Sequence, residues 1–81
     1  MYILKSEKDN DLYIGFTSNL ERRIEEHNSG WVASTESRKP LKLVYCEGYN
    51  SERDARRREA NLKLHSRAFA QLKIRIMDSL K

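Results

Sequence analysis

The sequence lacks the cysteines of a cross-linked protein and the long apolar runs of a membrane protein. Its single cysteine, Cys46, excludes an internal disulfide framework or thiolate metal site. It lies in an apolar run, so it is expected to be a small core residue. No signal segment or run of about 20 apolar residues is found. These absences predict a cytoplasmic protein without a membrane partner.

The chain also lacks the length for a thick core. With 81 residues it is expected to form one domain, residues 1–81, without repeats or linkers. Domains this small bury only roughly 60% of their unfolded surface. A shallow cleft for an extended polymer is therefore expected, rather than a deep cavity or a small-molecule cofactor site.

Positive charge is concentrated near the C-terminus. The formal net charge is +4, yet residues 1–50 carry 7 basic and 8 acidic residues, whereas residues 51–81 carry 9 and 4. This asymmetry indicates a polyanionic partner. A solvated helical face explains the charge alone equally well.

Apolar patterning predicts an α+β fold. Residues 2–5 and 12–17 are predicted strands joined by a polar hairpin loop at 7–11, and residues 43–49 are a third strand. In the second strand, the apolar residues Leu12, Ile14 and Phe16 share one face, and Tyr13 and Gly15 share the other. A glycine there suits the close approach of another group to the sheet.

Three helices complete the predicted order β-β-α-β-α-α. Ser18 is expected to cap the first helix, which ends at about Asn28 with Gly30 as its C-terminal cap. Ser51 is expected to cap the second, which ends at about Lys63. The third begins near Ser66 and carries the apolar residues Phe69, Leu72, Ile76 and Leu80. The sheet should be small, three-stranded and mainly antiparallel, with three helices packed on it.

Two predicted helices carry polar residues on their apolar faces. In the first, Arg23 and His27 fall on the face of Leu20 and Ile24; each is also explained as a solvated edge or polar end. In the second, Glu59 lies on the inward stripe, where an ion pair with a neighbouring arginine is the simpler explanation. Together, a carboxylate for a divalent cation, an arginine for phosphate and a proton-transfer group suit phosphodiester hydrolysis.

Five segments in order resemble the GIY-YIG nuclease family. Tyr-Ile-Leu-Lys-Ser at 2–6 and Leu-Tyr-Ile-Gly-Phe-Thr-Ser at 12–18 resemble its paired tyrosine motifs. Residues 19–30 are similar to its Arg-and-His helix. Arg-Lys-Pro followed by Leu-Val-Tyr within 38–45 matches the entry to its third strand, and residues 58–63 resemble the helix with its glutamate.

The resemblance implies a role for each candidate. Tyr2 or Tyr13 would activate the attacking water and the other would orient water or phosphate, with Tyr2 favoured as the base. Arg23 would stabilise developing charge, and His27 would assist proton transfer or hold phosphate. Glu59 would bind one metal ion, Mg²⁺ or Mn²⁺.

The sequence departs from the family pattern at three places. No Gly-Ile precedes Tyr2, Asp11 stands where many members have a lysine, and no asparagine follows Glu59 at a matching position. Gly15 keeps its place and would be structural. The departures bear mainly on how the nucleophile is activated.

The sequence therefore predicts a metal-dependent endonuclease acting on nucleic acid, with DNA the expected form. The alternatives are a non-catalytic nucleic-acid-binding module with the same fold and a protein-interaction domain. Trp31 could stack on a base or pack after the helix end. Residues expected to contact nucleic acid are the basic side chains of Arg38, Lys39, Arg53, Arg56, Arg57, Lys63 and Arg67.

Overall fold

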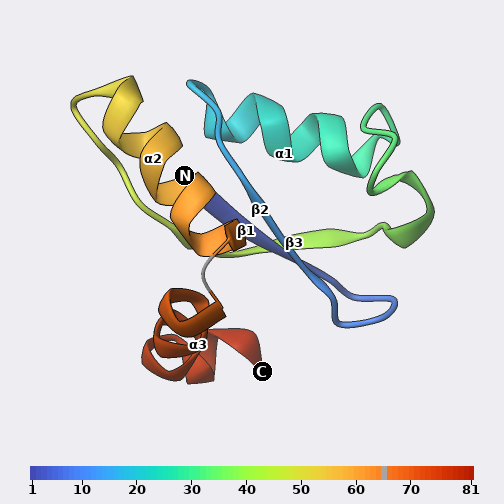
Figure 1. Cartoon of the computed structure of the whole chain (residues 1–81). Helices are drawn as coiled ribbons and strands as arrows, with labels where there is room; N and C mark the ends of the chain where they lie inside the picture. Colours follow the sequence, from blue (N-terminus) through green and yellow to red (C-terminus); the bar gives the residue numbers. More distant parts are fainter. Residues whose placement is uncertain (65) are drawn as a thin grey trace.

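The fold is a three-stranded antiparallel sheet with helices on both faces (Figure 1). The computed structural model describes residues 1–64 and 66–81. The α+β class and the order β-β-α-β-α-α are confirmed. The strands are β1 (Tyr2–Ser6), β2 (Leu12–Gly15) and β3 (Leu41–Cys46). The helices are α1 (Leu20–Asn28), α2 (Glu52–Leu64) and α3 (Ser66–Arg75), with 3-10 turns η1 (Glu36–Arg38) and η2 (Met77–Leu80).

Strand β1 is the central strand, because the order across the sheet is β2-β1-β3. Tyr2, Ile3 and Leu4 are all buried. Their side chains alternate between the two faces of the sheet. Each face can therefore hold a separate apolar cluster, and β2 is left as an edge strand.

Each face of the sheet carries one apolar cluster, and the helices are divided between the two faces. Figure 1 shows α1 above the strands and α3 below them. On the α1 face the cluster comprises Tyr2, Leu4 and Leu41, packed by Tyr13, Leu20, Ile24 and Leu43. On the other face it comprises Met1, Ile3, Leu62, Leu72 and Ile76, packed by Leu12, Ile14 and five further side chains, namely Val44, Tyr45, Ala68, Phe69 and Leu80. The predicted alternation of β2 is confirmed, since Leu12 and Ile14 face away from Tyr13.

Helix α1 begins one residue later than predicted. Its N-cap is Asn19, whose side chain accepts from Arg22 N at 3.1 Å. Ser18 is therefore not the cap. At the other end Gly30 has φ 81°, and Trp31 N donates to Glu26 O at 3.0 Å. This left-handed glycine closes the helix as predicted.

Strand pairing corrects the bounds of the predicted strands. The register between β1 and β3 sets the ends of β3, because Tyr2 pairs with Cys46 and Ser6 pairs with Leu41. The strand is thus Leu41–Cys46 instead of 43–49, and β2 ends at Gly15 rather than residue 17. Cys46 is exposed at the end of an edge strand, so its predicted place in the core is wrong.

The last predicted helix is divided into α3 and η2. Helix α3 ends at Arg75, and Leu80 lies in the 3-10 turn η2. Lys5 Nζ donates to the Leu80 carbonyl, which ties this turn to β1. Across residues 1–64 and 66–81, no helix combines the length and apolarity needed to cross a membrane.

Candidate active site

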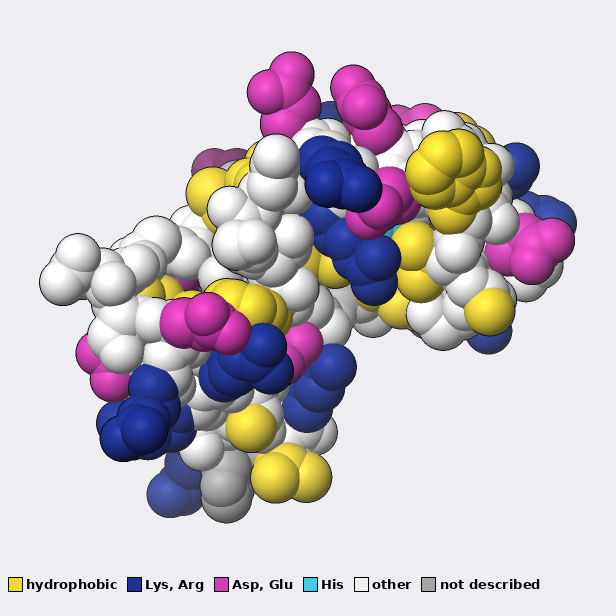
Figure 2. Space-filling view, turned by 90° about the horizontal axis from the view of Figure 1, so that it is seen from above, with side chains coloured by type: hydrophobic (Ala, Val, Ile, Leu, Met, Phe, Trp, Pro, Cys, Tyr) yellow, Lys and Arg dark blue, Asp and Glu magenta, His cyan; other side chains and the backbone are white. Residues whose placement is uncertain are grey.

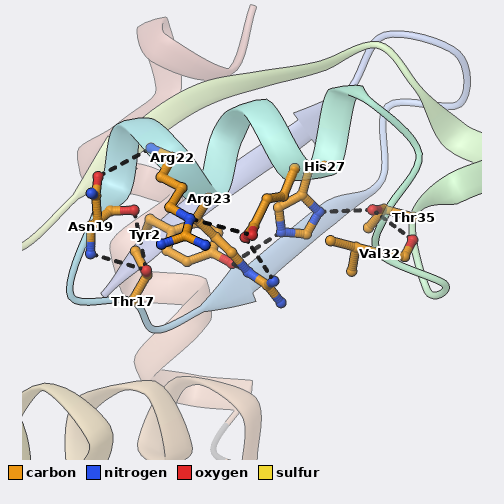
Figure 3. A network of polar contacts seen from close by, with 9 residues as sticks. Tyr2, Thr17, Asn19, Arg22, Arg23, His27, Val32 and Thr35 are labelled. Carbon is orange, nitrogen blue, oxygen red and sulfur yellow. Dashed lines mark hydrogen bonds and ion pairs between the residues drawn. The ribbon is translucent and has the colours of Figure 1, made fainter.

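Three predicted site residues form one hydrogen-bonded cluster beneath α1 (Figure 3). Tyr2 Oη lies 3.0 Å from His27 Nε2, and Arg23 Nε donates to the same oxygen over 3.4 Å. Arg23 and His27 reach it together because residues four apart share a helical face. His27 is only 4% exposed, so it is not a solvated helix end.

Thr35 fixes the tautomer of His27. Its hydroxyl lies 2.7 Å from His27 Nδ1 and donates to the Val32 carbonyl at 3.5 Å. A hydroxyl has one proton to give, so Thr35 accepts from Nδ1–H. His27 Nε2 then carries the lone pair and accepts the Tyr2 hydroxyl proton. Thr35 is fully buried, but it lies in a polar loop without periodicity, so no sequence signal identified it.

The cluster combines a neutral imidazole with a cation. Burial lowers the pKa of His27, the charge of Arg23 lowers it further, and Glu26 opposes both. The hydrogen bond to Tyr2 raises the pKa of Arg23, with a smaller contribution from Glu26. At neutral pH the Tyr2 phenol therefore lies between a proton acceptor and a positive charge.

Folding stability should fall as the pH drops below about 6.5, the ordinary histidine pKa. Because the pKa of His27 is lower in the folded state, the unfolded chain binds more protons in this range, and stability rises with pH. As the pH falls, the free energy of unfolding should decrease less for His27→Gln than for wild type. Urea unfolding between about pH 7.5 and pH 5 would measure it. If the free energy of unfolding changed equally with pH in the two proteins, the lowered pKa of His27 in the folded state would be contradicted.

Gly15 makes room for Tyr2. The two residues are cross-strand partners, and a Cβ on Gly15 would collide with Cζ and Oη of Tyr2. The group that approaches the sheet at this glycine is therefore the Tyr2 phenol. Gly15 determines where the phenolic oxygen lies relative to His27.

Gly15→Ala is expected to destabilise the fold by about 1–3 kcal/mol, the usual cost of overpacking. Tyr2 is buried and hydrogen-bonded, so it cannot move aside freely. Gly48→Ala is the matched control, since a Cβ there meets nothing within 4 Å. Denaturant unfolding measures both variants. Equal stability of the two would show that Tyr2 does not need the space.

Tyr13 lies on the same face of the sheet as Tyr2 but on the edge strand. Its hydroxyl is buried and has no hydrogen-bond partner among the described residues. The Arg38 guanidinium carbon lies 5.8 Å from its ring centroid, and Tyr13 raises the pKa of Arg38. Arg38 also pairs with Asp11 at 2.5 Å and Asp9 at 3.4 Å. Arg38, predicted to bind nucleic acid, thus has internal partners.

A groove at the edge of β2 connects Tyr13 with α2. Tyr13, Ser34 and Lys63 line it together with apolar side chains, around a cavity volume of about 400 Å³. Figure 2 shows the molecule hollowed between the α1 and α2 sides, with Lys and Arg side chains on both flanks. Lys63 Nζ lies 3.3 Å from Glu59 Oε2. The ion-pair partner of Glu59 is therefore this lysine, not an arginine.

The five candidate catalytic and metal-binding residues do not all contact one another. Tyr2, Arg23 and His27 contact one another directly. Tyr13 and Lys63 both line the neighbouring groove, and Lys63 pairs with Glu59. No hydrogen bond or ion pair among the described residues joins Glu59 to the cluster beneath α1.

Comparison with known proteins identifies the family. The GIY-YIG catalytic domain matches residues 1–73. The chain belongs to the GIY-YIG family. It is 48% identical over 68 residues to a UPF0213 protein of Staphylococcus haemolyticus, covering 83% of this chain and 82% of that protein. It is 50% identical over 64 residues to a UPF0213 protein of Clostridium perfringens, covering 78% and 68%. No solved structure is significantly similar.

Membership of the GIY-YIG family supports a nuclease-type function. Most basic candidates of this GIY-YIG domain are exposed, as a polyanion surface requires. Arg56 pairs with Glu52 at 2.8 Å, and Arg57 pairs with Asp54 at 3.4 Å. The other exposed candidates are Lys39, Arg53, Lys63 and Arg67.

Proposed function

We propose that this GIY-YIG domain is an endonuclease that hydrolyses phosphodiester bonds of nucleic acid, with DNA the expected substrate. One Mg²⁺ or Mn²⁺ ion would assist it. The observation that carries the proposal is the Tyr2 phenol held between Arg23 at 3.4 Å and His27 at 3.0 Å. A phenol has an ordinary pKa of about 10, so it needs such neighbours to act as a base near neutral pH.

Tyr2 and His27 provide a route for the proton. The Tyr2 hydroxyl proton passes to His27 Nε2, and the phenolate left behind takes a proton from the attacking water. The hydroxide forms a bond to phosphorus as the bond to the leaving oxygen breaks. The leaving oxygen takes a proton from solvent water, and His27 gives up its proton to restore the starting state. The Arg23 charge stabilises the phenolate, and Thr35 keeps His27 in the accepting tautomer.

Arg23 is also placed to contact phosphate. Its side chain is 38% exposed, and Glu26 holds its Nη1 at 3.3 Å. A guanidinium presents five N–H donors, so groups not used by Tyr2 and Glu26 remain for a phosphate. Donors fixed in advance are most effective where negative charge develops in the transition state.

Glu59 fits the role of a single carboxylate ligand. Its side chain is 23% exposed, and its partner Lys63 is a flexible ammonium that can be displaced. Within the described residues no group of three or more His, Cys, Asp or Glu side chains could hold a metal. Magnesium sites commonly use one or two carboxylates, with water and substrate phosphate completing the shell. A bound ion would supply charge neutralisation at the phosphate oxygens.

Binding to nucleic acid should be electrostatic and therefore salt-dependent. Residues 51–81 carry 9 basic and 4 acidic residues, and the basic candidates on α2 are exposed. Log affinity for a duplex should fall linearly with log salt, by roughly 0.9 per phosphate contacted. Fluorescence anisotropy of a labelled duplex in EDTA measures this slope. An affinity that does not change with salt would contradict a phosphate-binding surface.

The alternative is a non-catalytic nucleic-acid-binding module. The ion pair of Glu59 with Lys63 favours it, because this pairing competes with a metal for the carboxylate. Supercoiled plasmid separates the two functions. The endonuclease should convert it to nicked and linear forms with Mg²⁺ and leave it intact in EDTA. Binding without conversion in either Mg²⁺ or Mn²⁺ would favour the alternative.

A further inference from the structure

Trp31 is a large aromatic side chain without a packing role. It is 78% exposed, which excludes the interpretation that it packs after the helix end. Burying an aromatic ring is among the strongest apolar contributions to stability, and here it is not used. Exposed aromatic rings beside a functional site commonly serve recognition.

The backbone holds Trp31 at a fixed position beside the candidate active site. Trp31 N donates to Glu26 O at 3.0 Å, and Gly30 N donates to His27 O at 3.3 Å. Gly30 has φ 81°, which directs the chain out of α1 at this point. The residue is therefore placed by the last turn of the helix that carries Arg23 and His27.

A shallow hollow beside Trp31 shares one residue, Glu26, with the contacts of the cluster around Tyr2. It has a volume of about 180 Å³, and its lining includes Trp31, Arg22 and Glu26. Glu26 also binds Arg23 at 3.3 Å, so the hollow adjoins the proposed phosphate-contacting arginine. A nucleotide whose phosphate meets Arg23 would have a neighbouring base within reach of this surface.

We infer that Trp31 stacks on an unpaired base next to the cleaved bond, so that the substrate is a branched or partly single-stranded nucleic acid. The inference rests on the proposed function. Bases inside a continuous duplex already stack on each other, so an indole can stack only on a base that is unpaired or at an end. Stacking does not depend on base identity, which fits recognition of structure over sequence.

Charge around the hollow determines how the nucleotide would lie. Glu26 is neutralised by Arg23 at 3.3 Å and Arg22 at 3.7 Å. Glu25 also lines the hollow and has no ion pair among the described residues. Its charge would repel a backbone phosphate and direct the sugar-phosphate chain towards Arg22. Removing that charge with Glu25→Gln should therefore strengthen binding.

The emission of Trp31 provides a direct test, because it is the only tryptophan in the chain. The Glu59→Gln protein in EDTA would be titrated with a blunt duplex, a forked duplex and a single strand. We expect quenching with the fork and the single strand and little with the blunt duplex. Trp31→Ala should weaken fork binding by about 5- to 150-fold, the usual range for one stacked base, while Trp31→Phe keeps most of the affinity.

Ile74→Ala is the control for loss of an exposed apolar side chain, since Ile74 is 71% exposed on α3. It should not change fork binding. Fork affinity unchanged by Trp31→Ala, or equal quenching by the blunt duplex, would overturn the stacking assignment. Trp31-dependent fork binding without cleavage by wild type in either Mg²⁺ or Mn²⁺ would overturn only the proposed function. Absence of binding to all three nucleic acids would overturn both.

Discussion

Glu59→Gln is expected to abolish metal-dependent cleavage without lowering the melting temperature. The pair with Lys63 is a partly exposed i,i+4 contact, and such pairs contribute only about 0.3–0.5 kcal/mol. Removing a carboxylate kept for a metal should leave stability unchanged or slightly higher, as is common at functional sites. Mg²⁺ should stabilise the wild type and not the variant. Thermal unfolding in EDTA and in Mg²⁺, together with cleavage, measures all three effects.

Glu52→Gln is the matched control for Glu59→Gln. Glu52 lies on the same helix and forms the same kind of i,i+4 pair, with Arg56 at 2.8 Å. Its loss should leave cleavage intact. Cleavage by Glu59→Gln, or a large drop in its melting temperature in EDTA, would show that Glu59 is a structural ion-pair partner.

The two tyrosine-to-phenylalanine variants should differ in both rate and stability. Whichever tyrosine acts as the base should lose at least ~100-fold in rate, and the geometry favours Tyr2. Tyr2→Phe also leaves the buried Nε2 of His27 without a partner and removes one acceptor from Arg23, which costs about 1–3 kcal/mol. Tyr13→Phe removes a buried hydroxyl that has no partner, so stability should stay the same or rise. Single-turnover cleavage and urea unfolding of both variants measure these effects.

Tyr45→Phe provides a reference for loss of a tyrosine hydrogen bond away from the cluster. Tyr45 Oη donates to Glu47 at 2.6 Å. This variant should lose stability and keep the cleavage rate. Wild-type rates in both Tyr2→Phe and Tyr13→Phe would show that no tyrosine transfers a proton here.

Local patterns were sufficient to predict most of the fold. Alternation along β2 placed Leu12 and Ile14 on one face and Tyr13 on the other, because strand side chains have a period of two. The helical period brought Arg23 and His27 to one face of α1. Both patterns depend only on residues that are close together in the sequence, so they can be recognised without knowledge of the tertiary structure.

Properties that depend on distant segments were not predictable. Thr35 reaches His27 Nδ1 only because the loop after α1 folds back over that helix. Register between β1 and β3 determines where β3 ends, and that leaves Cys46 exposed. Trp31 directly follows the left-handed Gly30 and is exposed. None of these follows from composition or periodicity.

The most direct test of the account is cleavage of end-labelled duplex, branched and single-stranded nucleic acids by the wild-type protein in Mg²⁺, Mn²⁺ or EDTA. A metal-dependent endonuclease should cleave at least one substrate internally with Mg²⁺ or Mn²⁺. We expect no cleavage in EDTA, and none by Glu59→Gln under any condition. Binding of these substrates without cleavage by either metal, or cleavage that continues undiminished in EDTA, would contradict a metal-dependent endonuclease.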